Sequence, residues 1–329
     1  MRDIKRGAQA WENVRRSSAL QGIAAERLLV HSVADSTALS GYIPSLKRFV
    51  EWGVSNKVPC RTWEQMDHAL VIYQTKMCYE EDLHPHQSNL LMNALAYVWP
   101  ECSRCLPRAW RASQSFAKMT VLEQGGPVAL EALVCMETWL RHQEGSSAHV
   151  VADAIPVGVD GYLRGSEMLG LRKEDLAWDG DMVAAHLGRG VRGESSKSGR
   201  DQGVVFEDPY AVAVLRRRVA KLKDGGKVFP ISGNTLRDWW RRAAKALKLD
   251  LGPPHSMRHT GASRDLATGY RSFEQVQRRG RWKSMESVQR YARPHMWAAA
   301  LADLPAEVRE RGKSILSQRE PRPSKCKLG

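Results

Sequence analysis

The sequence predicts a mainly α-helical protein of the α+β class, with a small antiparallel β-sheet in its second half. Apolar residues recur at spacings of three and four along most of the chain, which is the period of an amphipathic helix. Residues 182–187 and 203–206 instead have the composition of two short strands, and a segment rich in Gly, Ser, Arg and Lys separates them. With 329 residues the chain is longer than most single cores, so we expect two domains.

The first half has the pattern of a helical domain. Residues 1–35 mix charged and small residues, and we expect them to form a helical arm. From Ser36 onward the helical period is regular, and one apolar stripe contains Tyr42, Leu46, Phe49 and Trp52. Further helices are expected between the prolines of this half, at residues 63–79, 87–99 and 108–119. The pattern predicts a compact helical domain at residues 36–122.

A second domain is expected at residues 123–306. The Gly-Gly-Pro sequence at residues 125–127 interrupts the helical pattern, and a new apolar helix is expected directly after it at residues 128–140. The later elements are expected in the order helix, strand, helix: residues 210–222, 228–230 and 235–247, the last capped by Asn234. Residues 307–329 are basic, contain several prolines and are poor in apolar side chains, so we expect a disordered tail.

The charge of the chain favours a polyanionic partner. Lys and Arg outnumber Asp and Glu by 50 to 36, which gives a net charge of +14 and a pI near 9.7. Nucleic acid suits this balance better than a membrane surface, although general solubility charge is an alternative. No apolar run approaches the roughly 20 residues that span a bilayer, so no membrane partner is expected. The N-terminus has no continuous apolar segment of a secretion signal, which favours an intracellular protein, in prokaryotic cytoplasm or a eukaryotic nucleus.

The six cysteines are too sparse for a disulfide framework and favour a reducing compartment. Cys102 and Cys105 have the spacing of zinc ligands, but no second pair follows them. His84, His86 or Cys78 would be needed to complete such a site. We therefore predict no metal and no cofactor, with zinc at this pair as the open alternative.

The residues with the most distinctive chemistry lie between His255 and Tyr291. His255 and Arg258 are three residues apart, so a helix would direct both side chains towards one point. Arg presents a planar fork of donors that suits phosphate, and His transfers protons near neutral pH. Trp282 offers one N–H donor, and Tyr291, nine residues later, offers an oxygen nucleophile. Such a set suits cleavage of a phosphodiester without a metal.

In three places the second half resembles the tyrosine recombinase (phage integrase) family. Residues 161–171, Gly-Tyr-Leu-Arg-Gly-Ser-Glu-Met-Leu-Gly-Leu, look like the family's first box, whose arginine is catalytic. Residues 255–260, His-Ser-Met-Arg-His-Thr, match its His-x-x-Arg-His-Thr box. The spacing from Trp282 to Tyr291 is similar to that between the family's His or Trp and its nucleophile. Each match is weak alone, whereas three in the right order are specific.

The resemblance covers roughly residues 125–300 and, more weakly, residues 36–120. It implies a site-specific DNA recombinase or integrase with a catalytic domain at residues 123–306 and a helical, SAM-like core-binding domain at residues 36–122. The implied partner is double-stranded DNA, with no small-molecule substrate. The family also implies a homo-oligomer, a tetramer on paired sites, and residues 296–316 would be the segment exchanged between protomers.

The family assigns a role to each residue of the three boxes. Arg164 and Arg258 would hold the negative charge that develops on the phosphate oxygens, and Trp282 would donate its indole N–H to the same phosphate. Tyr291 would attack phosphorus and form a 3′-phosphotyrosyl link with a free 5′-hydroxyl. The link conserves the energy of the ester bond, so rejoining would need neither metal nor ATP.

Four further residues would support this chemistry. The resemblance implies that His255 is a general base or phosphate donor and that Lys197, between the two predicted strands, protonates the leaving oxygen. A solvated lysine is the alternative there, and Arg200 is the rival for phosphate contact. Glu167 and His259 are expected to be structural, with Glu167 orienting Arg164.

The sequence departs from the family at one position. Members commonly have Gly directly before the His or Trp, whereas Arg281 intervenes here between Gly280 and Trp282. The spacing to Tyr291 favours Trp282 as the phosphate donor, with Arg281 as the alternative. Two other functions also remain open, namely a type IB topoisomerase and a DNA-binding protein that keeps the fold without cutting.

Overall fold

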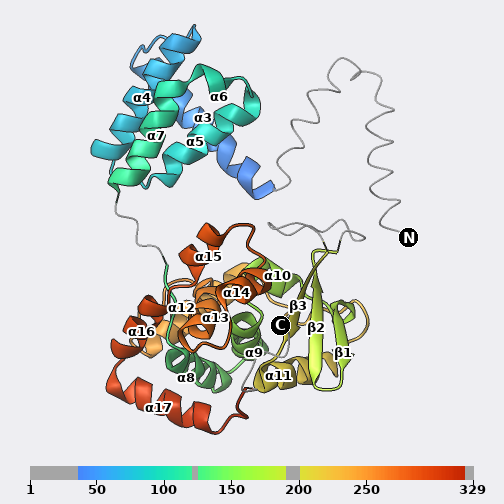
Figure 1. Cartoon of the computed structure of the whole chain (residues 1–329). Helices are drawn as coiled ribbons and strands as arrows, with labels where there is room; N and C mark the ends of the chain where they lie inside the picture. The colour runs from blue at the N-terminus through green and yellow to red at the C-terminus, as the bar shows by residue number, and fades with distance from the viewer. Residues whose placement is uncertain (1–35, 121–124, 190–200, 323–329) are drawn as a thin grey trace, which may run out of the picture. The chain divides into compact units, whose positions relative to one another are not determined.

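The computed structural model describes residues 36–120, 125–189 and 201–322, which fall into two compact units divided at Gly125. Helices dominate both units, and the second also contains a small antiparallel sheet (Figure 1). The predicted α+β class is therefore confirmed. The arm predicted at residues 1–35 and the end of the chain from residue 323 lie outside the described residues.

The first unit is a helical domain with its own core. Its helices are α3 (Ser36–Ser55), α4 (Trp63–Tyr79), α5 (His86–Val98), α6 (Cys102–Cys105) and α7 (Pro107–Met119). Thr62 caps α4 by accepting a hydrogen bond from the Gln65 N–H at 3.2 Å. Buried Asp67 of α4 accepts hydrogen bonds from the N–H groups of Arg108 (3.2 Å) and Ala109 (2.8 Å), which fixes the start of α7 against α4.

The Cys102–Cys105 pair lies on the short helix α6. Cys102 is part of the buried core, and burial raises the pKa of its thiol to about 11, which keeps it protonated at neutral pH. A zinc ligand has to be a thiolate. Among the described residues, no three or more His, Cys, Asp and Glu side chains are grouped closely enough to hold a metal ion.

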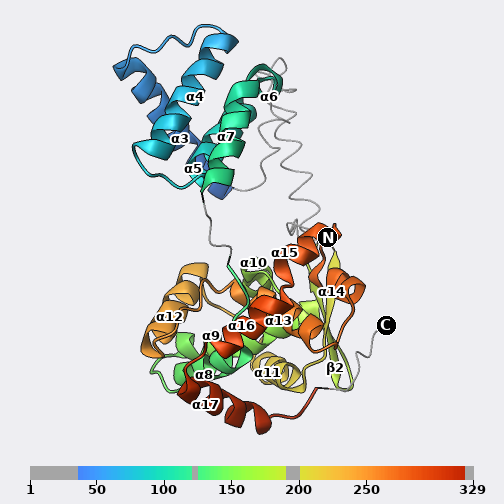
Figure 2. The same cartoon turned by 60° about the vertical axis from the view of Figure 1, so that its left-hand side comes forward.

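The second unit is built around helix α9 (Ser146–Asp160), which is buried continuously from Val150 to its end. The other helices are α8 (Leu130–Arg141), α10 (Gly165–Gly170), α11 (Pro209–Val219), α12 (Gly233–Ala246), α13 (Ser256–Ala267), α14 (Phe273–Gly280), α15 (Met285–Tyr291), α16 (Pro294–Ala302) and α17 (Ala306–Ser317), with a short 3-10 turn at Lys173–Asp175. Helices α8, α11, α12 and α13 pack around α9 (Figure 2). Segments of the second unit that are far apart in sequence thus meet along one helix.

The sheet has the strand order β1 (Leu176–Asp179), β2 (Met182–Leu187) and β3 (Gln202–Phe206), all antiparallel. The predicted strands at residues 182–187 and 203–206 correspond to β2 and β3. The third strand expected at residues 228–230 is wrong, because Val228 and Phe229 are buried core residues beside an isolated bridge, and β1 is the third strand instead. Val228 and Phe229 are apolar because they are buried in the core, not because they pair in a sheet.

One predicted helix cap also differs. Ser232, not Asn234, caps α12, because its hydroxyl accepts a hydrogen bond from the Thr235 N–H at 3.0 Å. Asn234 lies inside the first turn and accepts a hydrogen bond from Arg237. Both residue types are good caps, and the chain begins the helix two residues earlier than the sequence indicates.

The prediction of disorder from residue 307 is wrong as far as residue 322. Helix α17 packs on α8 so closely that a Cβ added at Gly312 would come within 2.5 Å of the Glu131 side chain. Beyond it, Arg319 pairs with Glu137 at 2.7 Å. The basic residues that indicated disorder instead form ion pairs with carboxylates of the second unit. None of the helices in the described ranges is long and apolar enough to cross a membrane.

Candidate active site

Three segments of the second unit bring most of the predicted residues together. Arg164 is the N-cap of α10, four residues after the last residue of α9. His255 and Arg258 lie at the start of α13, and helices α14 and α15 pack against α13. Trp282 lies between α14 and α15, and Tyr291 is the last residue of α15. The short distance between Trp282 and Tyr291 in sequence therefore spans a single turn and helix.

Arg258 is the buried centre of this site, with none of its surface exposed. Its two terminal nitrogens donate hydrogen bonds to the carbonyl oxygens of Tyr162 and Gly280. Its guanidinium carbon lies 4.5 Å from the centroid of the Trp282 ring and 5.6 Å from that of Tyr291. A Cβ at Gly280 would lie 1.9 Å from the indole, so only glycine leaves room for Trp282 against Arg258.

The Glu167 carboxylate lies next to three arginines, one of which is Arg258. Its carboxylate accepts from Arg164 Nη1 at 2.6 Å and from Arg281 Nη2 at 2.7 Å, and it lies 4.0 Å from Arg258 Nη1. Burial favours a raised pKa of Glu167, but Arg281, Arg164 and Arg258 outweigh it and lower the pKa. One carboxylate balances one of three guanidinium charges, so the site keeps an excess of positive charge that suits a phosphate.

Burial and the charges of Arg281 and Arg164 lower the pKa of Arg258 to about 9. The guanidinium therefore remains charged at neutral pH, at an energetic cost that a bound anion would relieve. Its Nε is buried without a hydrogen-bond partner in the described structure. A buried charge with this surplus of donors is suited to hold an anionic ligand.

The aromatic side of the site is formed around Tyr291. Its ring stacks on His259 with centroids 4.6 Å apart and lies tilted against Trp282 at 5.1 Å. The His255 ring meets it edge-on, with centroids 5.5 Å apart. Burial and the neighbouring His255 lower the pKa of His259 to about 4, so His259 is neutral at pH 7. Its Nδ1 lies 3.2 Å from the carbonyl oxygen of Tyr291 and must carry the hydrogen to donate to it.

Contacts thus link Arg164, through Glu167, to Arg258, and Arg258 to Trp282 and Tyr291, with His255 beside Tyr291. We call these residues the arginine–tyrosine cluster: Arg164, Glu167, His255, Arg258, Trp282 and Tyr291. Lys197 and its rival Arg200 lie outside the described residues, so the identity of the general acid stays a prediction.

Arg281, the alternative phosphate donor, has a buried side chain that is directed inward. It has a left-handed backbone (φ 56°) at the end of α14, and its guanidinium also donates to the carbonyl oxygens of Tyr162 (3.2 Å) and Arg279 (3.0 Å). With the bond to Glu167, this is the arrangement of a positioning residue. The departure from glycine at this position is the one sequence signal that marks it.

A second ionic network, which no sequence pattern predicted, adjoins the cluster through Tyr162. The Tyr162 hydroxyl donates to Asp265 at 2.5 Å, and Asp265 also pairs with Arg271 and, at 2.9 Å, with Arg322. Burial would raise the pKa of Asp265, but Arg322, Arg264 and Arg271 lower it. The network holds Tyr162 in place, and the Tyr162 carbonyl oxygen in turn accepts a hydrogen bond from Arg258.

One family model and several solved structures are similar to this chain. Residues 136–296 match the family model described as the phage integrase family. The integrase of the Tn1549 transposon, solved in complex with transposon right end DNA, is similar over 89% of this chain and 98% of its own, with 13% identity and a TM-score of 0.58.

Two other solved structures have similar folds. The XerH site-specific recombinase bound to palindromic difH substrate matches 80% of this chain and 79% of its own, with 13% identity and a TM-score of 0.58. A lambda integrase dimer bound to a COC′ core site matches 82% and 75%, with 16% identity and a TM-score of 0.56. No curated protein sequence matches this chain significantly.

Proposed function

The chain belongs to the phage integrase family, and on that premise we propose that it is a site-specific tyrosine recombinase that cuts and rejoins double-stranded DNA. The observation that carries the proposal is the placement of Arg164 and Arg258 on one carboxylate, with Arg258 against the ring of Tyr291. Cations beside a potential nucleophile are what phosphoryl transfer requires of a protein.

In the proposed reaction, the guanidinium groups of Arg164 and Arg258 bind the non-bridging oxygens of the scissile phosphate, and Trp282 donates its indole N–H to the same group. The phenol oxygen of Tyr291 attacks phosphorus while His255 takes the phenol proton. The bond from phosphorus to the 5′-oxygen breaks, and Lys197 protonates that oxygen. The product is a 3′-phosphotyrosyl link and a free 5′-hydroxyl.

Rejoining reverses these steps with the 5′-hydroxyl of another strand as the nucleophile. That hydroxyl loses its proton to Lys197, and His255 returns a proton to the departing phenol oxygen. One phosphate ester bond is made for each one broken, so the proposed cycle needs neither ATP nor a metal ion.

The proposed partner is duplex DNA. The similar Tn1549 integrase was solved in complex with transposon right end DNA, and the net charge of +14 supports such a partner. We further propose that the first unit is a core-binding domain and that four protomers act on paired sites inside the cell. In the described chain, α16 packs on α13 and α17 on α8 of the same molecule. The proposed exchange of residues 296–316 would replace these contacts by equivalent ones between protomers.

Covalent capture tests the proposal. A library of nicked duplexes with random sequence around the nick is incubated with the protein, and DNA–protein adducts are isolated under denaturing conditions and sequenced. We expect adducts with the wild type, linked through Tyr291 in peptide mapping, and none with Tyr291→Phe. The exposed Tyr79 supplies the matched control, since Tyr79→Phe should form adducts normally.

A second readout separates the rival functions. Two duplexes that carry the captured sequence should yield joined recombinant strands. Plasmid relaxation without recombinants would instead favour a topoisomerase, and sequence-specific binding with no adduct from any substrate would favour a protein that does not cut.

A further inference from the structure

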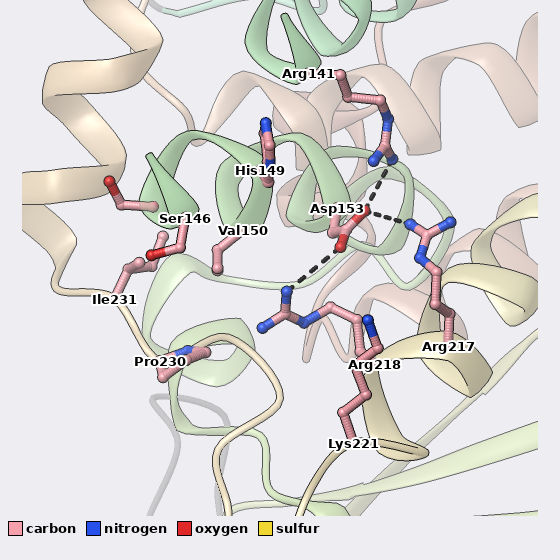
Figure 3. A pocket seen from close by; sticks show the side chains of 11 residues that line it. Arg141, Ser146, His149, Val150, Asp153, Arg217, Arg218, Lys221, Pro230 and Ile231 are labelled. Atoms are coloured by element: carbon pink, nitrogen blue, oxygen red, sulfur yellow. Dashed lines mark hydrogen bonds and ion pairs between the residues drawn. The ribbon is translucent and has the colours of Figure 1, made fainter. Parts of the chain in front are cut away.

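A basic cavity of about 550 Å³ lies at the first turns of α9, away from the arginine–tyrosine cluster (Figure 3). Side chains of α8, α9 and α11 line it, together with Pro230 and Ile231 of the segment before α12. Helix α9 has 15 residues, and Arg164 follows its opposite end. At 1.5 Å per residue the helix separates the two places by about 20 Å.

The lining of this cavity, which we call the α9 cavity, has an excess of positive charge. The Asp153 carboxylate accepts from Arg141 at 2.8 Å, Arg217 at 2.6 Å and Arg218 at 3.4 Å, as the dashed lines in Figure 3 show. Arg141 also pairs with Glu137 at 2.8 Å, so Arg217 and Arg218 are left to share the single carboxylate of Asp153. Lys221 adds a further charge, and no carboxylate in the described part of the chain pairs with it.

Arg217 and Arg218 keep N–H donors that are available to a ligand. Arg217 is half exposed and reaches Asp153 through Nη2 alone. Arg218 uses Nε for the carbonyl oxygen of Val228 (2.7 Å) and Nη1 for Asp153. A guanidinium has five N–H donors in a fixed plane, so each retains groups that can bind an oxyanion.

The N-terminus of α9 opens at the same cavity. The helix begins at Ser146 after Gly145 (φ 103°), and no side chain caps it. Its first N–H groups therefore lack the usual capping partner, and they carry the positive end of the helix dipole. Ser146 and Ser147 line the cavity, and Trp239 holds the Ser147 hydroxyl at 3.0 Å. An uncapped helix start beside arginines is an arrangement that binds phosphate.

We propose that the α9 cavity binds a small phosphate-bearing molecule at a site separate from the arginine–tyrosine cluster. Its volume is that of pockets for small organic ligands rather than for a single ion. Val150, Pro230 and Ile231 give it an apolar side, which suits the organic part of a nucleotide, while the arginines and Lys221 take its phosphates. The site is independent of DNA cleavage, so the proposed function can fail without affecting it.

Calorimetric titration of the full chain tests the site, with pyrophosphate and ATP as the two probes. Loss of one charged contact should weaken binding about tenfold in Arg217→Ala and in Lys221→Ala. In Arg217→Ala, Asp153 still forms ion pairs with Arg141 and Arg218, so the fold should persist. Circular dichroism checks that the variant is folded. Arg241→Ala and Lys313→Ala are matched controls at exposed positions elsewhere and should bind like wild type.

The arginine–tyrosine cluster is also expected to attract phosphate, so each probe is titrated into Arg164→Ala as well. We expect the Arg217-dependent binding to survive in that variant. If ATP binds more tightly than pyrophosphate, the ligand is a nucleotide. If the two probes bind equally, the ligand is a free polyphosphate. The proposal is overturned if neither probe binds, if Arg164→Ala alone abolishes binding, or if Arg217→Ala and Lys221→Ala weaken only the binding of duplex DNA.

Discussion

At the scale of single residues, the site depends on Glu167 as much as on the arginines that would contact phosphate. Its carboxylate holds Arg164 and Arg281 and lies near Arg258, so removal of that charge would leave three cations to repel one another. The spacing of Arg164 and Glu167 makes their pairing predictable from sequence. The pairing with Arg281 is not, because it joins residues 114 apart and depends on the tertiary fold that brings Arg281 to Glu167.

The histidine stacked on Tyr291 makes the stability of the second unit depend on pH. Burial lowers the pKa of His259 from 6.5 to about 4 in the folded state, so between these values the unfolded chain binds more protons. The stabilising effect of neutral His259 is therefore complete above pH 6.5 and is lost as the pH falls towards 4. We expect the free energy of unfolding to decrease by about 2–3 kcal/mol over this window from this residue alone.

Urea unfolding of the wild type and of His259→Asn at several pH values between 4 and 7 measures this contribution. Asparagine keeps an N–H donor for the Tyr291 carbonyl but does not titrate, so the variant should show a flatter profile. His142→Asn alters an exposed histidine and should reproduce the wild-type profile. Parallel profiles for His259→Asn and wild type would contradict the assignment.

At the scale of elements, sequence periodicity located helices that have one buried face, such as α4, α5 and α7. The helix expected at residues 63–79 coincides with α4, and β2 was found with its bounds. Strand β1 was missed because its four residues expose three side chains and show little alternation. The ordered structure of residues 307–322 was also not predictable, because their ion-pair partners Glu137, Asp160 and Asp265 lie far away in sequence.

Helix α17 depends on close backbone contact with α8 at Gly312. Because an added Cβ would lie 2.6 Å from the Glu131 carbonyl oxygen, Gly312→Ala should force the helices apart and destabilise their packing by about 1–3 kcal/mol. Hydrogen exchange should then become faster in residues 306–317. Gly53→Ala in α3 is the matched control, because open space around Gly53 allows the helix-favouring alanine to stabilise by up to about 1 kcal/mol. Unchanged exchange in α17 would show that the contact is dispensable.

At the scale of the whole molecule, the chain consists of two units with separate hydrophobic cores. The first is built around residues such as Leu70 and Leu91, and the second around α9. Each unit encloses its own buried side chains, so each should fold without the other. The proposed division of labour assigns phosphodiester chemistry to the second unit and part of the DNA affinity to the first.

That division predicts how DNA binding responds to salt. Each phosphate contact contributes a slope of about −0.9 to the dependence of log affinity on log salt concentration, so a fragment of residues 125–329 should bind duplex DNA more weakly and with a shallower slope than the full chain. Lys47 of the first unit is 73% exposed, and if it contacts a phosphate, Lys47→Ala should reduce the slope by about one unit in the full chain. Fluorescence anisotropy at several salt concentrations measures both effects. Equal slopes for the fragment and the full chain would mean that the first unit makes no backbone contacts, and its role would then have to lie in protein–protein assembly.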